Sequence, residues 1–115
     1  MRTIIAGSRT IVDKEAVFIA IARAPWTPTS VISGGAAGVD TLGEKWAHEH
    51  AVKVVRLEAD WNRFGKRAGY LRNIEMAALA EALILIWDGK SKGSGHMKQI
   101  AESRGLKVFE VIIPG

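Results

Sequence analysis

Five short apolar runs constrain the fold of this chain more than any other feature of its sequence. They span Thr3–Ala6, Val31–Ser33, Val52–Leu57, Ala82–Trp87 and Leu106–Ile113. The runs are rich in β-branched residues, and their apolar character is nearly continuous rather than alternating with polar residues. Strands buried on both faces have this pattern, which is typical of a parallel sheet covered by helices.

Four segments with helical spacing separate these runs. Asp13 is a candidate cap for the first helix, and Thr41-x-x-Glu44 has the spacing of a capping box in the second. The fourth is expected from about Ser94 to Arg104, with Gly105 as its stop. In chain order, the apolar residues at helical spacing are Val17, Ala20, Ile21 and Ala24; Val39, Leu42 and Trp46; Leu71, Ile74 and Ala78; and Met97, Ile100 and Ala101.

The alternation of strands and helices predicts an α/β fold of three layers. We expect five parallel strands in the Rossmann-like order 3-2-1-4-5, with helices on both faces, and the flavodoxin-like order 2-1-3-4-5 as the alternative. The chain has 115 residues, and no linker or repeat interrupts the pattern. One domain spanning residues 1–115 is therefore expected.

Composition excludes several classes of function. Cysteine is absent, which excludes disulfides, thiolate zinc sites and cysteine nucleophiles. His48 and His50 are two residues apart on a predicted helix, so their rings diverge and no metal site is expected. No run of about 18 apolar residues exists, and Met1 leads directly into a strand, so we expect a cytoplasmic protein without a membrane partner. The net charge of +4 favours anionic partners, either nucleic acid or a small phosphate-bearing ligand.

Glycine is concentrated where a parallel sheet binds ligands. Such sheets bind ligands beyond the carboxyl ends of their strands, where the strand order reverses, which here is between the first and fourth strands. Nine of the twelve glycines follow strands one to four: Gly7, Gly34, Gly35, Gly38, Gly65, Gly69, Gly89, Gly93 and Gly95.

The loops after strands one and two carry the first candidate site residues. Gly7-Ser8-Arg9 offers close backbone approach, a hydroxyl and a planar cation, although a simple turn is an equal alternative. Small residues run into a helix start between Ser33 and Asp40, where backbone amides and the helix dipole favour an anion. Asp40 either accepts a hydrogen bond from a ribose hydroxyl or caps the helix. The candidate ligand-binding residues of this second loop are Ser33, Gly34, Gly35, Gly38 and Asp40.

The loop after strand four provides a second candidate anion cradle. Gly89-Lys90-Ser91 resembles the end of a P-loop, but Ile84 stands where the first glycine of that motif is required, so the ATPase interpretation is rejected. The candidate ligand-binding residues of this loop are Asp88, Gly89, Ser91, Gly93 and Ser94.

The segment from Asp60 to Asn73 interleaves aromatic and basic residues. Aromatic rings stack on bases while cations contact phosphates, as in single-stranded nucleic-acid binders. Alternatively, the segment is a surface loop whose Trp61 and Phe64 pack on the core of the protein. Arg72 and Asn73 are placed at the start of the third long helix, on the same side of the sheet as the other candidates.

Four motifs occur in order along the chain. They are Gly7-Ser8-Arg9, Ser33-Gly34-Gly35-Ala36-x-Gly38-Val39-Asp40, Gly65-Lys66-x-Ala68-Gly69-x-x-Arg72-Asn73-x-x-Met76 and Trp87-Asp88-Gly89-x-Ser91-x-Gly93-Ser94-x-x-Met97. Together they resemble the SLOG superfamily, which includes the DNA-processing protein DprA and the LOG phosphoribohydrolases, and the small YspA-type branch is the most similar. The resemblance implies a Rossmann-like fold, a homodimer and a site for a nucleotide or a derivative such as NAD or ADP-ribose.

The resemblance also identifies candidate catalytic residues. In the LOG enzymes an arginine and a glutamate carry hydrolysis of the N-glycosidic bond. Arg72 matches that arginine, but Met97 stands in place of the glutamate, and a thioether neither moves a proton nor stabilises an oxocarbenium ion. Either Asp88 has taken over the carboxylate role, or this catalysis is absent.

Three functions follow from these patterns. The first is binding of a nucleotide-derived ligand by a sensor-like domain. The second is hydrolysis at a nucleotide linkage with Asp88 and Arg72 as catalytic residues. The third is binding of single-stranded nucleic acid, similar to DprA, through Arg63, Lys66 and Arg67. We expect weak or absent release of free base from nucleoside monophosphates.

Overall fold

Five parallel strands form the centre of the molecule. The computed structural model describes residues 1–114. The sheet has the order β3-β2-β1-β4-β5, and in it Ile4 of β1 pairs with Ile32 of β2 and Leu83 of β4. This confirms the order 3-2-1-4-5 over the flavodoxin-like alternative. The strands are β1 (Arg2–Gly7), β2 (Ser30–Ser33), β3 (Lys53–Arg56), β4 (Ala82–Trp87) and β5 (Lys107–Ile112).

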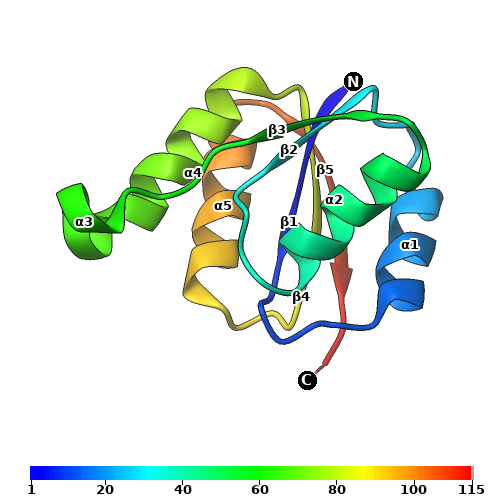
Figure 1. Cartoon of the computed structure of the whole chain (residues 1–115), viewed down its shortest axis with the longest axis horizontal. Helices are drawn as coiled ribbons and strands as arrows, with labels where there is room; N and C mark the ends of the chain where they lie inside the picture. The colour runs from blue at the N-terminus through cyan, green and yellow to red at the C-terminus, as the bar shows by residue number, and fades with distance from the viewer. Residues whose placement is uncertain (115) are drawn as a thin grey trace.

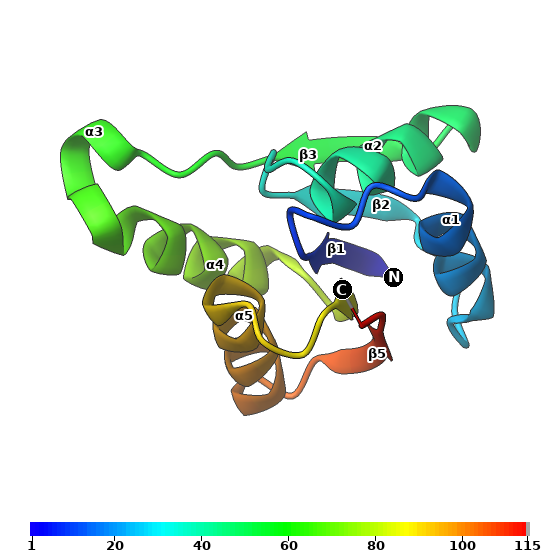
Figure 2. The ribbon, with the colours of Figure 1, turned by 90° about the horizontal axis from the view of Figure 1, so that it is seen from below.

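Helices cover both faces of the sheet, which gives the three predicted layers. In Figures 1 and 2, α1 and α2 lie on one side of the strands and α4 and α5 on the other. The short α3 and the 3-10 helix η1 lie beyond the start of α4, away from the sheet. None of the helices in residues 1–114 is long and apolar enough to cross a membrane. The helical elements are α1 (Lys14–Arg23), α2 (Val39–Glu49), α3 (Trp61–Phe64), η1 (Gly65–Arg67), α4 (Ala68–Leu79) and α5 (Lys92–Ser103).

The strand β4 lies at the centre of two hydrophobic cores. Leu83 and Leu85 pack with α4 and α5, whereas Ile84 and Ile86 pack with α1 and α2. All six residues of β4 are buried. Its unbroken apolar sequence therefore reflects burial on both faces, as the sequence pattern predicted.

The capping box predicted at Thr41-x-x-Glu44 is wrong. The helix α2 begins at Val39, because Gly38 is its N-cap, with a φ of 76° that is unfavourable for other residues. Thr41 is already inside the helix, and its hydroxyl donates to the Ala36 carbonyl at 2.8 Å. Glu44 bonds to Ser33 and Arg56 instead of to its own helix terminus.

The apolar stripe predicted for α4 does not match its buried face. Ile74 is 41% exposed, and Ala78 is also exposed, whereas Asn73, Met76 and Ala77 are buried. The reason is a polar contact between the two helices. Asn73 donates a hydrogen bond to the carbonyl of Gly93 at the start of α5, so the side of α4 that carries Asn73 faces α5.

The ends of α1 and α5 follow the sequence signals closely. The Asp13 carboxylate accepts hydrogen bonds from the amides of Glu15 and Ala16, which confirms it as the cap of α1. The helix α5 starts two residues before the predicted Ser94. It ends at Ser103, shortly before Gly105, whose φ is 72°.

Candidate functional site

A cavity of about 430 Å³ opens at the carboxyl ends of β1 and β4, where the strand order reverses. Residues from the loops after β1, β2 and β4 form its walls, together with residues of α3, η1, α4 and α5. Most of the predicted ligand-binding residues line it, namely Gly7, Ser8, Arg9, Asp40, Arg72, Asn73, Asp88, Ser91, Gly93 and Ser94.

The remaining predicted residues, Ser33, Gly34, Gly35, Gly38 and Gly89, are absent from the cavity wall. The amide of Gly35, predicted to meet a phosphate, donates to the Ser33 hydroxyl at 3.1 Å instead. The Ser33 hydroxyl in turn donates to Glu44 at 2.6 Å. The cradle predicted at Gly34-Gly35 is therefore a supporting layer behind the wall, bound into a local hydrogen-bond network.

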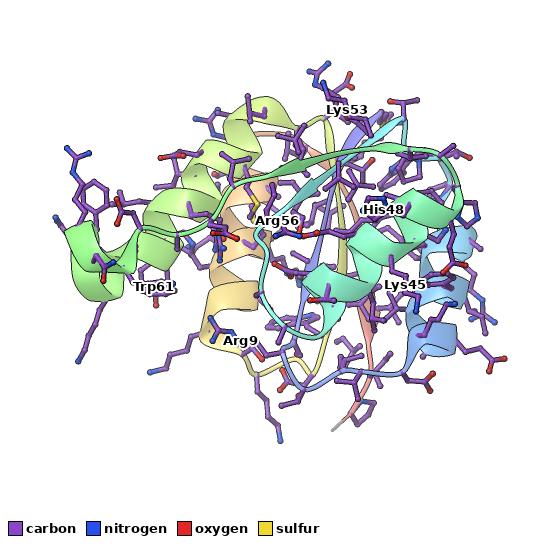
Figure 3. All side chains as sticks on the ribbon, viewed as in Figure 1. Arg9, Lys45, His48, Lys53, Arg56 and Trp61 are labelled. Atoms are coloured by element: carbon purple, nitrogen blue, oxygen red, sulfur yellow. The ribbon has the colours of Figure 1, made fainter. Side chains whose placement is uncertain are left out.

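Arg56 completes that supporting layer. It reaches from β3 toward α2 and pairs with the buried Glu44 (Figure 3). This pairing lowers the pKa of Glu44 and raises that of Arg56. No sequence pattern indicated this pair, because Glu44 and Arg56 belong to different elements and their approach depends on how α2 packs beside β3.

Ser8 joins the loops after β1 and β4. It is buried, and its hydroxyl oxygen accepts a hydrogen bond from the Asp88 amide at 3.0 Å. The Ser8 and Ser91 hydroxyl oxygens are 3.2 Å apart, and Ser91 donates its own proton to the Asp88 carboxylate at 3.0 Å. Ser8 is then the donor to Ser91, and the three residues form a closed ring of hydrogen bonds.

The Asp88 carboxylate organises the start of α5. One of its oxygens accepts hydrogen bonds from the amides of Lys90 and Ser91, at 2.8 and 2.9 Å, and from the Ser91 hydroxyl. These bonds lower the pKa of Asp88 to about 2. A carboxyl with that pKa is ionised throughout the neutral range, which counts against Asp88 as a replacement proton donor.

The first turn of α5 presents backbone amides to the cavity. Ser91 is the N-cap, but its hydroxyl oxygen accepts no hydrogen bond from the amides of the first turn, and it contacts Ser8 and Asp88 instead. Gly93 and Ser94 follow in the first turn and line the cavity. Uncapped amides at a helix N-terminus, aided by the helix dipole, favour binding of an anion.

Arg72 crosses from α4 to the loop after β2. Its Nη1 donates to the Gly34 carbonyl at 2.8 Å, and its Nε donates to the Asn73 side-chain oxygen at 3.1 Å. Asn73 in turn donates to the Gly93 carbonyl at 3.2 Å and lies 3.1 Å from Nδ1 of His96. Asn73 thus fixes the Arg72 guanidinium relative to α5.

Asp40 is a buried carboxyl in the cavity wall, with 5% of its surface exposed. Its Oδ2 accepts a hydrogen bond from the Ala36 amide at 3.3 Å. Burial raises the pKa of Asp40 to about 6, against the opposing effects of that amide and of Arg72. Of the two carboxyls that line the cavity, Asp40 is the one that changes its charge close to neutral pH.

Two aromatic rings and a lysine form the outer part of the cavity. Trp61 of α3, Lys66 of η1 and Tyr70 of α4 line it, and the two rings are 51% and 42% exposed. Figure 3 shows Trp61 on α3 and Arg9 in the loop beyond β1. The alternative in which Trp61 and Phe64 pack on the core is wrong, because both side chains are exposed.

Met97 lines the inner part of the cavity and is 1% exposed. The position that would carry a LOG-type glutamate thus faces the cavity but bears a thioether. Within residues 1–114, no group of three or more His, Asp or Glu side chains is arranged to bind a metal ion.

Comparison with known sequences identifies the family. Residues 1–64 match the sequence model of the YspA, cpYpsA-related SLOG family. The chain belongs to this SLOG family. This SLOG protein is also 35% identical over 118 residues to the Gene 61 protein of Mycobacterium phage D29, an alignment that covers 94% of each chain. No solved structure matches it significantly.

Proposed function

We propose that this SLOG protein binds a nucleotide or a nucleotide-derived molecule, of the NAD or ADP-ribose kind, in the cavity between β1 and β4. One observation carries the proposal: cationic side chains, the first turn of α5 and exposed aromatic rings line one cavity at the switch point of a parallel sheet. Its volume of about 430 Å³ lies within the usual range for sites of small ligands.

The anion-binding end consists of the α5 N-terminus and nearby cations. The amides of Gly93 and Ser94 supply hydrogen-bond donors, and the Ser94 hydroxyl adds another polar group. Arg9 and Arg72 line the same cavity, and both side chains have planar guanidinium groups suited to a phosphate. A phosphate or pyrophosphate is the ligand group that this set of donors fits best.

The aromatic end suits a nucleobase. Trp61 and Tyr70 contribute two exposed rings, and a base stacked on either ring covers apolar surface while its polar edges stay in contact with water. Lys66 adds a cation beside them. A ligand with a base at one end and a phosphate at the other satisfies both ends of the cavity.

Calorimetric titration with AMP, ADP-ribose and NAD tests the proposal. We expect at least one of them to bind, and we expect Arg72→Ala to weaken that binding about tenfold or more, because a charge-assisted hydrogen bond contributes about 1.5–3 kcal/mol. Lys53→Ala is the control, since Lys53 is an exposed cation of β3 outside the cavity. Absence of binding by all three compounds, or unchanged affinity in Arg72→Ala, contradicts the proposal.

A further inference from the structure

Two carboxyls line the cavity, and neither a phosphate nor a stacked base requires them; Asp88 binds the amides at the start of α5, whereas Asp40 has no such role. Asp40 is buried in the wall, with 5% of the residue's surface exposed, whereas Trp61 and Tyr70 are about half exposed. A carboxylate repels phosphate and attracts hydrogen-bond donors. A ligand that fits this cavity should therefore carry hydrogen-bond donors as well as an anionic group.

Gly34 lets the Asp40 carboxylate and the Arg72 guanidinium approach the loop after β2 closely. A Cβ on Gly34 would lie 2.9 Å from Asp40 Oδ2 and 2.5 Å from Arg72 Nη1, so any side chain there would collide with both groups. Within residues 1–114, Asp40 forms no ion pair; Oδ2 accepts a hydrogen bond of 3.3 Å from the Ala36 amide, and the Gly7 amide also interacts with the carboxyl. The carboxylate thus retains unused acceptor capacity beside the cavity.

We propose that Asp40 accepts hydrogen bonds from the ribose hydroxyls of the ligand, so that this site selects ribonucleotides over 2′-deoxyribonucleotides. The inference rests on the proposed function and adds the class of sugar. A nucleotide has two kinds of neutral donor that suit a carboxylate: sugar hydroxyls and the amino group of a base. A base stacked on Trp61 or Tyr70 keeps its amino group beside these exposed rings, so the sugar is the part of the ligand that we expect to reach the buried Asp40.

Loss of a ribose hydroxyl has a measurable consequence at such a site. The deoxy analogue would bury the Asp40 carboxylate without its partner, and sites built around a ligand hydroxyl reject analogues that lack it. We expect the wild-type protein to bind AMP about tenfold to hundredfold more tightly than 2′-deoxy-AMP. The same preference is expected for ADP-ribose over its 2′-deoxy form.

Titration of each ribo and deoxy pair into three proteins tests the inference: wild type, Asp40→Asn and Glu44→Gln. Asn is isosteric with Asp and still accepts from the Ala36 amide, and circular dichroism would verify the fold. In Asp40→Asn, the preference for the ribo form should be lost, so that the ribo and deoxy forms bind with about equal affinity. Glu44 is a buried carboxylate one turn further along α2 and outside the cavity, so Glu44→Gln should keep the wild-type preference.

Several outcomes would overturn the inference. Equal affinity of wild type for the ribo and deoxy forms rejects it while leaving the proposed function intact. An equal loss of affinity for both forms in Asp40→Asn shows that Asp40 only supports the loop, and also rejects it. If neither AMP nor ADP-ribose binds wild type, and NAD does not bind either, the proposed function fails and the inference fails with it.

Discussion

At the scale of single residues, Asp40 shows how a candidate site lowers the stability of its own fold. The carboxyl is surrounded by Arg72 of α4, Glu44 of α2 and the amides of Ala36 and Gly7, and burial outweighs the favourable contacts. Its pKa rises from the ordinary 3.8 to about 6 in the folded protein. Because the folded state binds this proton more tightly than the unfolded state, the contribution of Asp40 to stability is full below pH 3.8 and is lost as the pH rises through 6.

Asp40→Asn should therefore stabilise the protein at pH 7.5. The variant resembles the protonated form, and a pKa difference of this size corresponds to a gain of up to about 3 kcal/mol in the free energy of unfolding. The gain should disappear near pH 4. Urea unfolding at both pH values measures it, and a variant that is less stable than wild type at pH 7.5 would contradict the assigned burial cost.

At the scale of elements, the site depends on contacts between segments that are far apart in sequence. Arg72 of α4 contacts the loop after β2 through the Gly34 carbonyl, and Asn73 connects the same helix turn to the start of α5. Ser8 and Asp88 join the loops after β1 and β4. These contacts place a cation, a carboxylate and a helix N-terminus around one cavity.

Gly34→Ala should displace Arg72 and weaken nucleotide binding. The new Cβ would lie 2.5 Å from Arg72 Nη1, so the guanidinium must move from its position in the cavity wall. We expect at least about a tenfold loss of affinity by calorimetry, comparable to loss of one charge-assisted hydrogen bond. Gly95→Ala is the matched control, because its Cβ meets only the Trp87 ring at an ordinary 3.6 Å and α5 gains helix propensity. Wild-type affinity in Gly34→Ala would argue against a role for Arg72 in binding.

At the scale of the whole molecule, the positions of the cations favour the proposed small ligand over nucleic acid. Arg9, Lys66 and Arg72 line the cavity, whereas the exposed Arg63 and Arg67 lie outside it. A binder of single strands requires many phosphate contacts along a groove, and its affinity then falls steeply with salt. A nucleotide in the cavity meets only the few cations that line it.

We therefore expect binding of AMP or ADP-ribose to weaken less than about tenfold between 50 and 200 mM salt, since a protein with many phosphate contacts loses about 10³–10⁵ over that range. Binding of a labelled single-stranded oligonucleotide should be weak under the same conditions. Fluorescence anisotropy across a salt series measures the second quantity. Tight, strongly salt-dependent oligonucleotide binding with no mononucleotide binding would support the nucleic-acid function instead.

The chemistry of the cavity predicts no appreciable release of adenine from AMP. Met97 occupies the position that carries a glutamate in LOG enzymes, and Asp88 is ionised and bonded to the start of α5. Chromatography of AMP incubated with the purified protein tests this, with Met97→Glu in parallel. Robust adenine release by wild type, abolished by Asp88→Ala, would identify an enzyme with a relocated carboxylate.

The local sequence pattern determined the elements and their order. The continuous apolar run of β4 indicated burial on both faces, Asp13 marked the start of α1, and Gly105 marked the end of α5. These signals are readable because strand and helix periodicity, caps and stops involve residues close together in sequence. The order of parallel strands then brought the glycine-rich loops to one edge of the sheet, where the cavity lies.

Only the tertiary structure decided which residues of those loops face the cavity and in which charge state. Gly34 and Gly35 support the wall from behind it, the exposed Trp61 belongs to its outer part, and Asn73 turns the polar side of α4 toward α5. Burial by segments distant in the chain raises the pKa of Asp40. In contrast, hydrogen bonds within the local turn lower the pKa of Asp88. Periodicity reports which face of an element is apolar, whereas the free energy of a buried polar group depends on the particular atoms that surround it.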